Sequence, residues 1–371
     1  MARLRGLTTM EDQAAAQSEG LRHAAGDLLT FATTLLERAG LARERARTVA
    51  EVLLEGDLLG HTTHGLELLP AYLTELTNGG MAVEGEPRVV ADLGAAITWD
   101  GGRLPGPWLV RRAIAEARSR VPVHPVVSLA IRRSHHIACL QAYLKPVTDA
   151  GLVILLLSSD PANTGVAPHG GVVPCLTPNP IAAGWPTAGD PVLLDISMST
   201  TTNAMVKRVR AEGGRLPGPW LVDAHGVATD APSALTPDGG ALLPLGGLDL
   251  GHKGFGLALL VEALTSGLAG YGRADRPTEW GASVFLQIMD PDAFGGRDAF
   301  VREAQFIADR CREARVPDGQ PPVRLPGERA LARRRRLLRE GVPLRASTRA
   351  GLAEWAERFD VPLPRVHAES A

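Results

Sequence analysis

The segment VVSLAIRRSHH, residues 126–136, places a short aliphatic run directly before two arginines and two histidines. A run of this length predicts a buried β-strand, here Val126–Ile131. Similar runs predict further strands at Ala96–Trp99, Leu152–Ser158, Val192–Ile196 and Ser283–Ile288. Helical patterns at 112–119 and 255–270 lie between these strands. Strands that alternate with helices predict a mixed α/β or α+β fold with a mixed sheet in the middle of the chain.

Both ends of the chain show helical periodicity. Near the start, apolar residues from Leu28 to Leu36 fall on one face and Gly40 ends the pattern. A second helix is predicted at 42–59, and a third in LELLPAYLTEL (66–76). Three more helices, at about 299–315, 327–340 and 347–358, are expected to pack back on the first three.

Composition excludes several classes of protein. The 371 residues carry 39 basic and 41 acidic side chains, so a net charge of -2 gives no electrostatic reason to expect a nucleic-acid or membrane partner. The longest aliphatic run, Leu152–Leu157, is far too short to span a bilayer. Residues 1–20 lack the apolar core of a signal peptide, and a loose tail is expected there. Three cysteines without metal-ligand spacing fit a reduced cytoplasmic protein.

One decapeptide, GGRLPGPWLV, occurs twice, at 101–110 and at 213–222. A single repeat of this kind does not indicate a solenoid. We expect each copy to form a turn that leads into an element burying its tryptophan.

The histidines are the first chemical signal. Four of the ten fall in two tight clusters, HTTHG (61–65) and SHH (134–136). Histidine titrates near neutral pH and is also the commonest zinc ligand. For HTTHG a metal site, proton chemistry or substrate binding, and simple packing all remain open. For SHH, a position just after a strand favours general acid–base work by one of the two histidines.

Two further segments have the composition of ligand-binding loops. Residues 158–199 contain three turn-rich stretches whose small residues and Ser, Thr and Asn side chains suit phosphate or ribose. GHKGFG (251–256) is expected to open the apolar helix 255–270, where backbone N–H groups and Lys253 would favour an anion. No GxGxxG motif follows a strand, and the chain has neither a P-loop nor a GxSxG elbow.

Taken together and in this order, five segments resemble the type 2 malate/L-lactate dehydrogenase family, which includes sulfolactate and ureidoglycolate dehydrogenases. They are DLLGHTTHGLELLPAYL (57–73), IRRSHHIACLQAYL (131–144), TPNPIAAGWPT (177–187), DISMST (195–200) and GHKGFGLALLVEALTSGLAG (251–270). The resemblance implies a nicotinamide-dependent oxidoreductase, with NAD favoured over NADP. It also implies a non-Rossmann, L-sulfolactate dehydrogenase-like cofactor domain and a homodimer with the active site near the subunit interface.

The same resemblance implies a division of the chain. Residues 1–22 would be a disordered tail, and 23–125 the N-terminal part of a substrate and dimerisation domain. Residues 126–272 would bind the nicotinamide cofactor, and 273–371 would pack back on the N-terminal part.

Site residues follow from matching the family's motifs. The S-x-H-x-G motif aligns with residues 134–138 and places the catalytic histidine at His136, and S-H-G aligns with 63–65 and makes His64 a second acid–base candidate. Two departures stand out: Leu68 occupies the place of a substrate-binding arginine, and Ala138 that of a glycine. Residues expected near the cofactor are Thr177, Asn179, Asp195, Ile196, Ser197, Ser199, His252 and Lys253.

The expected reaction is reversible hydride transfer between the nicotinamide C4 and the C2 of a small 2-hydroxy or 2-oxo acid. His136 would exchange the proton near its ordinary pKa of about 6.5, with His64 sharing the task and no metal involved. Substrate-binding candidates are Arg132, Arg133, His135 and Lys253. The alternatives are reduction of a cyclic imine carboxylate, a metal-dependent lyase or hydrolase, and a relative that binds cofactor without turnover.

Overall fold

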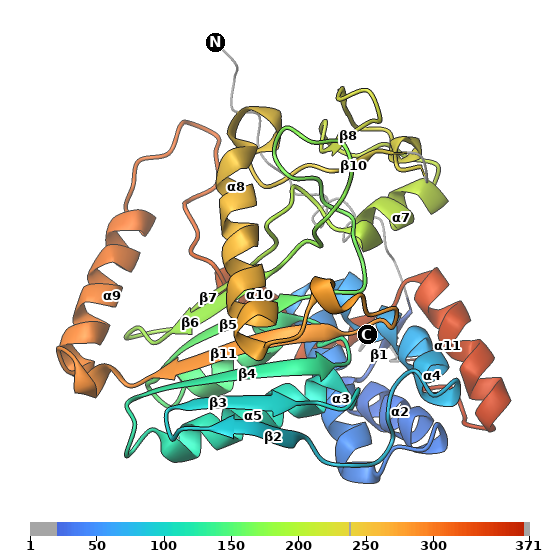
Figure 1. Ribbon diagram of the computed structural model, residues 1–371, viewed down its shortest axis with the longest axis horizontal. Coiled ribbons are helices and arrows are strands. Elements are labelled where there is room, and N and C mark those ends of the chain that lie inside the picture. The colour runs from blue at the N-terminus through green and yellow to red at the C-terminus, as the bar shows by residue number, and fades with distance from the viewer. Residues whose placement is uncertain (1–20, 237–238, 367–371) are drawn as a thin grey trace.

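A mixed seven-stranded sheet is the centre of the computed structural model, which describes residues 21–236 and 239–366 (Figure 1). Only the pair β3–β4 among its neighbouring strands is parallel, so the predicted mixed sheet is confirmed. In spatial order the strands are β2 (Arg88–Asp92), β3 (Ala96–Asp100), β4 (Val126–Ser134), β11 (Ala282–Met289), β5 (Val153–Ser159), β6 (Ile181–Trp185) and β7 (Val192–Ile196).

The central strands are aliphatic because both faces of the sheet are covered. Most residues of β4, β5 and β11 are buried, whereas every residue of the edge strand β2 is exposed. All five predicted strands are present. Sequence patterns did not reveal β2, whose face is solvated, or β6, which lies within the turn-rich stretch TPNPIAAGWPT.

Strand register brings the C-terminal ends of β4, β5 and β7 together along one edge of the sheet, the edge at which these strands end. Ser134 at the end of β4 pairs with Ala282, and Ser159 at the end of β5 pairs with Ser283. Ile196 at the end of β7 pairs with Ile181 at the start of β6. The segments that follow β4, β5 and β7 therefore all begin at this edge.

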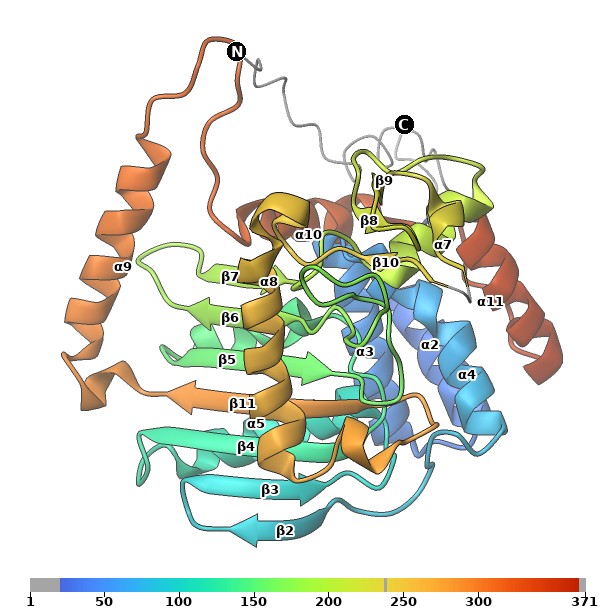
Figure 2. The ribbon, with the colours of Figure 1, turned by 45° about the horizontal axis from the view of Figure 1, so that its top comes forward.

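Helices cover both faces of the sheet, and Figure 2 shows α8 in front of it with α3 and α5 behind. The helices are α2 (Ala25–Arg38), α3 (Arg43–Leu59), α4 (Leu69–Thr77), α5 (Gly106–Arg120), α6 (Lys145–Thr148), α7 (Asn203–Ala211), α8 (Gly247–Glu262), α9 (Arg297–Arg312), α10 (Glu328–Glu340) and α11 (Ala346–Phe359). The expected packing of the C-terminal helices is confirmed for two of the three, because α10 contacts α3 and α11 contacts α2 and α4. It is wrong for α9, which stands apart from these helices (Figure 1).

The chain ends are also joined by a small sheet. Strand β1 (Arg22–His23) pairs with β12 (Val342–Pro343). Of the tail predicted at 1–22, residues 1–20 lie outside the described residues, and Arg22 belongs to this sheet. The seven-stranded sheet takes strands from all three longer segments of the predicted division, which itself stays a prediction.

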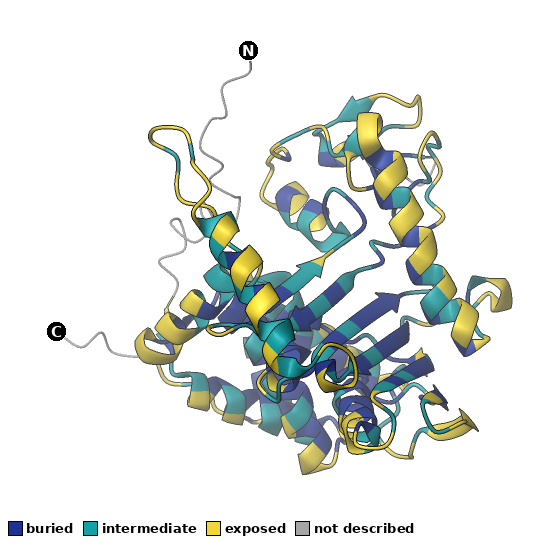
Figure 3. Cartoon of the chain, turned by 90° about the vertical axis from the view of Figure 1, so that its left-hand side faces the viewer, coloured by how far each residue is buried: buried dark blue, intermediate teal, exposed yellow. Residues whose placement is uncertain are grey.

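The helix predicted at 255–270 begins earlier than expected. Helix α8 starts at Gly247 and continues into a π-helical turn over Ala263–Gly267, so GHKGFG lies inside the helix and the predicted anion site at its start is wrong. The apolar residues of this helix are also only partly buried. Val261 is buried, but Leu257, Leu260 and Leu268 are exposed, and much of α8 is exposed in Figure 3.

The two copies of GGRLPGPWLV adopt different structures. In the first, Pro-Gly-Pro-Trp opens α5, and Trp108 is buried. In the second, the same residues form a bend before β8 (Leu221–Val222), and Trp220 is half-buried. The expectation of a buried tryptophan therefore holds for the first copy only. Strand β8 lies between β9 (Ala228–Thr229) and β10 (Ala241–Leu242) in a small antiparallel sheet.

Within the described ranges 21–236 and 239–366, we find no helix with the length and apolar character that a membrane span requires.

Candidate active site

A cavity of about 1230 Å³ opens at the sheet edge where β4, β5 and β7 end. Its wall combines the HTTHG segment, the residues after β4 and β5, the TPNP turn and helix α7. Both histidines predicted to be catalytic, His64 and His136, line it, and their rings stack with centroids 5.8 Å apart. Two histidine clusters separated by about 70 residues of sequence therefore meet in one cavity.

Two aromatic side chains hold the His136 ring. The Tyr72 hydroxyl lies 2.9 Å from His136 Nδ1 and donates to the His136 carbonyl oxygen, also at 2.9 Å. The indole of Trp280 lies against the same imidazole, with centroids 4.9 Å apart. The Ala138 backbone nitrogen lies 3.3 Å from Nδ1. Because every one of these hydrogen bonds is made at Nδ1 or the backbone, Nε2 is the nitrogen suited to exchange a proton with a ligand.

The backbone after β4 is strained at the position where the family has glycine. Ala138 is buried and has a φ of 58°, in the left-handed region that favours glycine. Alanine thus adopts a conformation that suits glycine better, and the chain turns the Ala138 amide toward the imidazole.

Burial makes both histidines poor bases. Desolvation, with the neighbouring His64 and His135, lowers the pKa of His136 well below 6.5. Desolvation, with His61 and Arg208, lowers the pKa of His64 to about 4. The expectation that His136 titrates near 6.5 is therefore wrong for the cavity without ligands, where the imidazole is neutral at pH 7.

Close backbone packing positions His64. Its 3-10 turn, Thr62–His64, is followed by a second, Leu66–Leu68. The Leu66 amide donates to the buried Asp57 carboxylate on α3 at 2.7 Å, and desolvation raises the pKa of Asp57 to about 7. A Cβ at Gly65 would meet that carboxylate at 2.5 Å, so only glycine allows this approach.

The substrate-binding candidates beside the SHH motif lie outside the cavity. Arg132 and Arg133 both pair with the buried Asp100, at 3.2 and 2.8 Å. His135 is completely buried, and its Nε2 lies 3.3 Å from Glu75. Burial lowers the pKa of His135 to about 3. These three side chains fix the strand end, and the structure gives none of them access to a substrate in this cavity.

The predicted cofactor residues divide into three groups. Thr177, Asn179, Asp195 and Ser197 line the large cavity. Ile196 lines a smaller neighbouring cavity of about 660 Å³. The remaining three line neither cavity: Ser199 is buried and donates to the Thr201 carbonyl, and His252 and Lys253 are exposed on α8.

Thr177 and Asn179 form a polar junction between the TPNP turn and α8. The Thr177 hydroxyl donates to Asn179 Oδ1 at 2.7 Å. Asn179 is completely buried and donates to the Ala258 carbonyl and to Glu262, at 3.1 and 3.0 Å. Near them, Ser158, Ser159 and Asp160 continue the polar wall from the end of β5. This side of the cavity offers hydroxyl, carboxylate and backbone groups.

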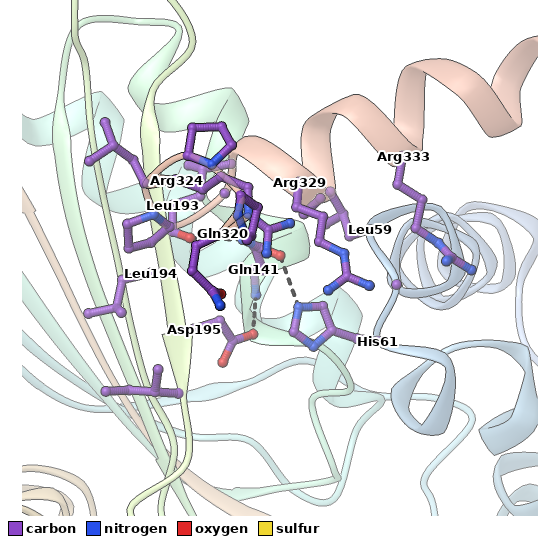
Figure 4. Close-up of a pocket in the computed structure, with 18 of the residues that line it drawn as sticks. Leu59, His61, Gln141, Leu193, Leu194, Asp195, Gln320, Arg324, Arg329 and Arg333 are labelled. Atoms are coloured by element: carbon purple, nitrogen blue, oxygen red, sulfur yellow. Dashed lines mark hydrogen bonds between the residues drawn. The ribbon is translucent and has the colours of Figure 1, made fainter. Parts of the chain in front are cut away.

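Asp195 connects β7 to the segment that follows the catalytic motif (Figure 4). Its Oδ2 accepts the Gln141 amide at 2.8 Å, and the Gln141 side chain in turn contacts His61 Nε2 at 2.9 Å. Burial raises the pKa of this carboxyl, while His61 acts in the opposite direction. Asp195 therefore braces a neighbouring turn as well as lining the cavity.

His61, Cys139 and Asp195 form a possible metal-ligand group within the described part of the chain. Their candidate ligand atoms all lie within 4.8 Å of one another. His61 and Asp195 already hydrogen-bond to Gln141, and Cys139 contacts Asp195 at 3.8 Å. Internal bonds thus account for the cluster, and the absence of metal from the reaction stays a prediction.

Three residues at the site went unrecognised in the sequence: Tyr72, Trp280 and Arg208. Tyr72 stands on an apolar helix face, and its place within the segment 57–73, which also contains HTTHG, was the available signal. Trp280 and Arg208 follow no motif.

Comparisons with known proteins identify the family of this chain. A family model described as malate/L-lactate dehydrogenase matches residues 24–353. The chain is 34% identical to a Δ1-pyrroline-2-carboxylate/Δ1-piperideine-2-carboxylate reductase of Pseudomonas syringae pv. tomato, covering 85% of this chain and 91% of that protein. It is 27% identical to hydroxycarboxylate dehydrogenase B of Escherichia coli K12, covering 92% and 96%.

A solved structure shows the same fold. The sulfolactate dehydrogenase of Methanocaldococcus jannaschii superimposes with a TM-score of 0.81 over 92% of this chain and 98% of that one, at 21% identity. Like these relatives, the protein is an oxidoreductase. It belongs to the malate/L-lactate dehydrogenase family, which confirms the resemblance found in the sequence.

Proposed function

We propose that this protein catalyses reversible hydride transfer between a nicotinamide cofactor, preferably NAD, and C2 of a small 2-hydroxy or 2-oxo acid. The observation that carries the proposal is the pairing of His136 and His64 in one cavity, with His136 held at Nδ1 by Tyr72. This arrangement presents one imidazole nitrogen to a ligand in a fixed orientation.

The residues at the cavity fit a dinucleotide. The cavity is larger than the roughly 300–1,000 Å³ typical of small-molecule sites, so a small acid alone would fill little of it. Its polar wall, with Ser158, Ser159, Asp160 and the Thr177 turn, suits ribose and phosphate groups. When bound, the nicotinamide ring supplies or takes up the hydride.

The protein's own part is proton transfer and orientation. During oxidation, neutral His136 keeps its proton on Nδ1, which donates to the Tyr72 oxygen, and accepts the proton of the substrate hydroxyl at Nε2 while the C2 hydrogen leaves as hydride. During reduction, protonated His136 returns that proton to the oxygen formed from the carbonyl. Because burial lowers the pKa of His136, the free enzyme is ready for oxidation, and reduction requires a bound anion to favour the imidazolium.

A second candidate is reduction of a cyclic imine carboxylate. It is favoured by the 34% identity to a reductase named for such imines. The chemistry is parallel, since hydride again adds at C2, and the nitrogen carries the proton in place of oxygen.

The test is a steady-state assay of purified enzyme with NADH and NADPH against pyruvate, oxaloacetate, Δ1-pyrroline-2-carboxylate and Δ1-piperideine-2-carboxylate. We expect turnover of at least one of these acids, and His136→Asn should lower kcat by about 10²- to 10⁴-fold with cofactor affinity little changed. Cofactor binding without turnover of any acid would contradict the proposal. Activity that depends on added Zn²⁺ would favour a metal-dependent enzyme instead.

We also propose that the enzyme is a homodimer that uses the α8 and α9 surface. Leu257 and Leu260 of α8 and Leu268, just beyond the π-helical turn, are exposed, as are Phe306 and Ile307 of α9. A contiguous group of exposed apolar side chains is typical of a contact surface. Since Asn179 ties α8 to the cavity wall, such an interface would lie near the active site. Analytical ultracentrifugation should find a dimer, and Leu260→Glu should weaken it.

Three free cysteine thiols support a reducing, cytoplasmic location.

A further inference from the structure

The substrate carboxylate lacks its expected partner in this chain. Leu68, at the position where family members carry an arginine, lines the cavity with an apolar side chain. Arg132 and Arg133 are held by Asp100, and Lys253 is exposed on α8 away from the cavity. A buried carboxylate without a cationic or hydrogen-bonding partner is strongly unfavourable, so another side chain must fill this role.

Arg208 occupies a suitable place. It lies on α7, its side chain is only 12% exposed, and it lines the same cavity as His64 and His136. Its Nη2 donates to Glu67, the residue next to Leu68, and lies 3.3 Å from the Thr62 hydroxyl. The guanidinium therefore rests against the turn that carries His64.

We propose that Arg208 binds the substrate's C1 carboxylate and so replaces, from a different helix, the arginine that Leu68 lacks. This inference rests on the proposed function and assigns the substrate-orienting cation within it. A planar guanidinium offers five donors, so Arg208 can keep its bond to Glu67 and still present a fork to a carboxylate.

The surrounding charges favour an anion at this end of the cavity. Arg345 also lines it and pairs with Glu212 at 3.4 Å. Burial lowers the pKa of Arg345, and Arg208 adds to that effect, which shows that the two guanidinium groups repel each other. A carboxylate bound at Arg208 would relieve this repulsion. It would also favour protonation of His64 and His136, as reduction requires.

The experiment compares Arg208→Met with Arg210→Met. Arg210 is two residues further along α7, exposed and outside the cavity, so its variant is the matched control. With the best substrate of the acid panel, we expect Arg208→Met to raise KM by about 10- to 100-fold, because a charge-assisted pair is lost. Arg208→Lys should fall between Arg208→Met and the wild type, since lysine keeps the charge without the fork. Arg210→Met should resemble the wild type.

A second readout separates binding from scaffolding. Wild-type enzyme should discriminate the acid from its carboxamide, and this discrimination should shrink by the same factor in Arg208→Met. The double variant Arg208→Met/Glu67→Gln removes both charges, and its KM should stay raised although no unpaired carboxylate remains. An unchanged KM and acid–amide ratio in Arg208→Met, or a KM restored in the double variant, would overturn the assignment. Wild-type enzyme inactive on every acid would instead contradict the proposed function itself.

Discussion

Replacing Gly106 with alanine should damage the active site from outside it. A Cβ at Gly106 would lie 2.3 Å from the His135 carbonyl oxygen and 2.4 Å from that of His136. Since Cβ atoms essentially never approach within 3.0 Å, the shorter contact must open by about 0.7 Å in a densely packed interior. The displaced groups are backbone, so they cannot rotate away. The peptide that carries the catalytic imidazole must therefore move.

The expected effect follows from that displacement. Misplacement of a reacting group by about 1 Å can lower a rate by about 10²-fold, so we expect kcat of Gly106→Ala to fall by about 30- to 100-fold. Overpacking should also lower the free energy of unfolding by about 1–3 kcal/mol, although alanine is normally the better helix former. Kinetics with NADH and the preferred acid would measure the first effect, and urea unfolding the second.

The second decapeptide supplies a control in the same sequence context. Gly218 is the equivalent glycine, and its added Cβ would meet only the half-buried Trp220 side chain, at 2.9 Å. A side chain can move aside, so Gly218→Ala should keep nearly normal activity. Equal activities for the two variants, or a Gly106→Ala enzyme with normal kcat, would refute the view that this glycine sets the position of His136.

Four further outcomes are expected. Because the pKa of His136 is lowered, kcat/KM for hydroxy-acid oxidation should stay nearly constant from about pH 8 down to about pH 6, whereas a base of ordinary pKa would lose activity there. Burial raises the pKa of Asp57 to about 7. The stability that its bound proton contributes is therefore full below about pH 4 and is lost as the pH rises through 7. Asparagine resembles the protonated form, so Asp57→Asn should raise the melting temperature more at pH 8 than at pH 5. Ala138→Gly should stabilise the protein by about 1 kcal/mol by relieving left-handed strain, as chemical denaturation would measure. Asp195→Ala should lower the melting temperature without cofactor because it removes the acceptor of a backbone amide, and fluorescence titration with NADH would show whether cofactor affinity falls as well.

The sheet was predictable because its central strands are buried on both faces. A strand that is buried on both faces is a continuous aliphatic run in the sequence. The runs that form β4, β5 and β11 could therefore be predicted as strands without knowing which strands lie beside them. The start of α8 was not predictable in the same way. Glycines at 251, 254 and 256 suggested a helix boundary, but all three lie inside the helix, and at Gly254 the close approach of the Leu245 backbone requires glycine.

The site shows the same division between local and distant information. His64 and His136 stand in recognisable motifs, and the structure brings them together. The roles of Arg132 and Arg133 depend on Asp100, more than 30 residues earlier in the chain, and a basic pair beside a catalytic motif gives no sign of such a partner. Arg208 lies at the cavity, although no motif in the sequence around it predicts that position, because it stands on a short polar helix.

The repeated decapeptide shows that the same ten residues adopt two different conformations in this chain. Identical letters become the first turn of a helix before RRAIAEARSR, whose residues are good helix formers, and a bend and short strand before DAHG, a turn sequence. The same ten residues can therefore adopt either conformation, and the flanks and final neighbours of each copy select between them. For anyone who grafts or redesigns this fold, the unit to transplant is the decapeptide together with the ten residues that follow it.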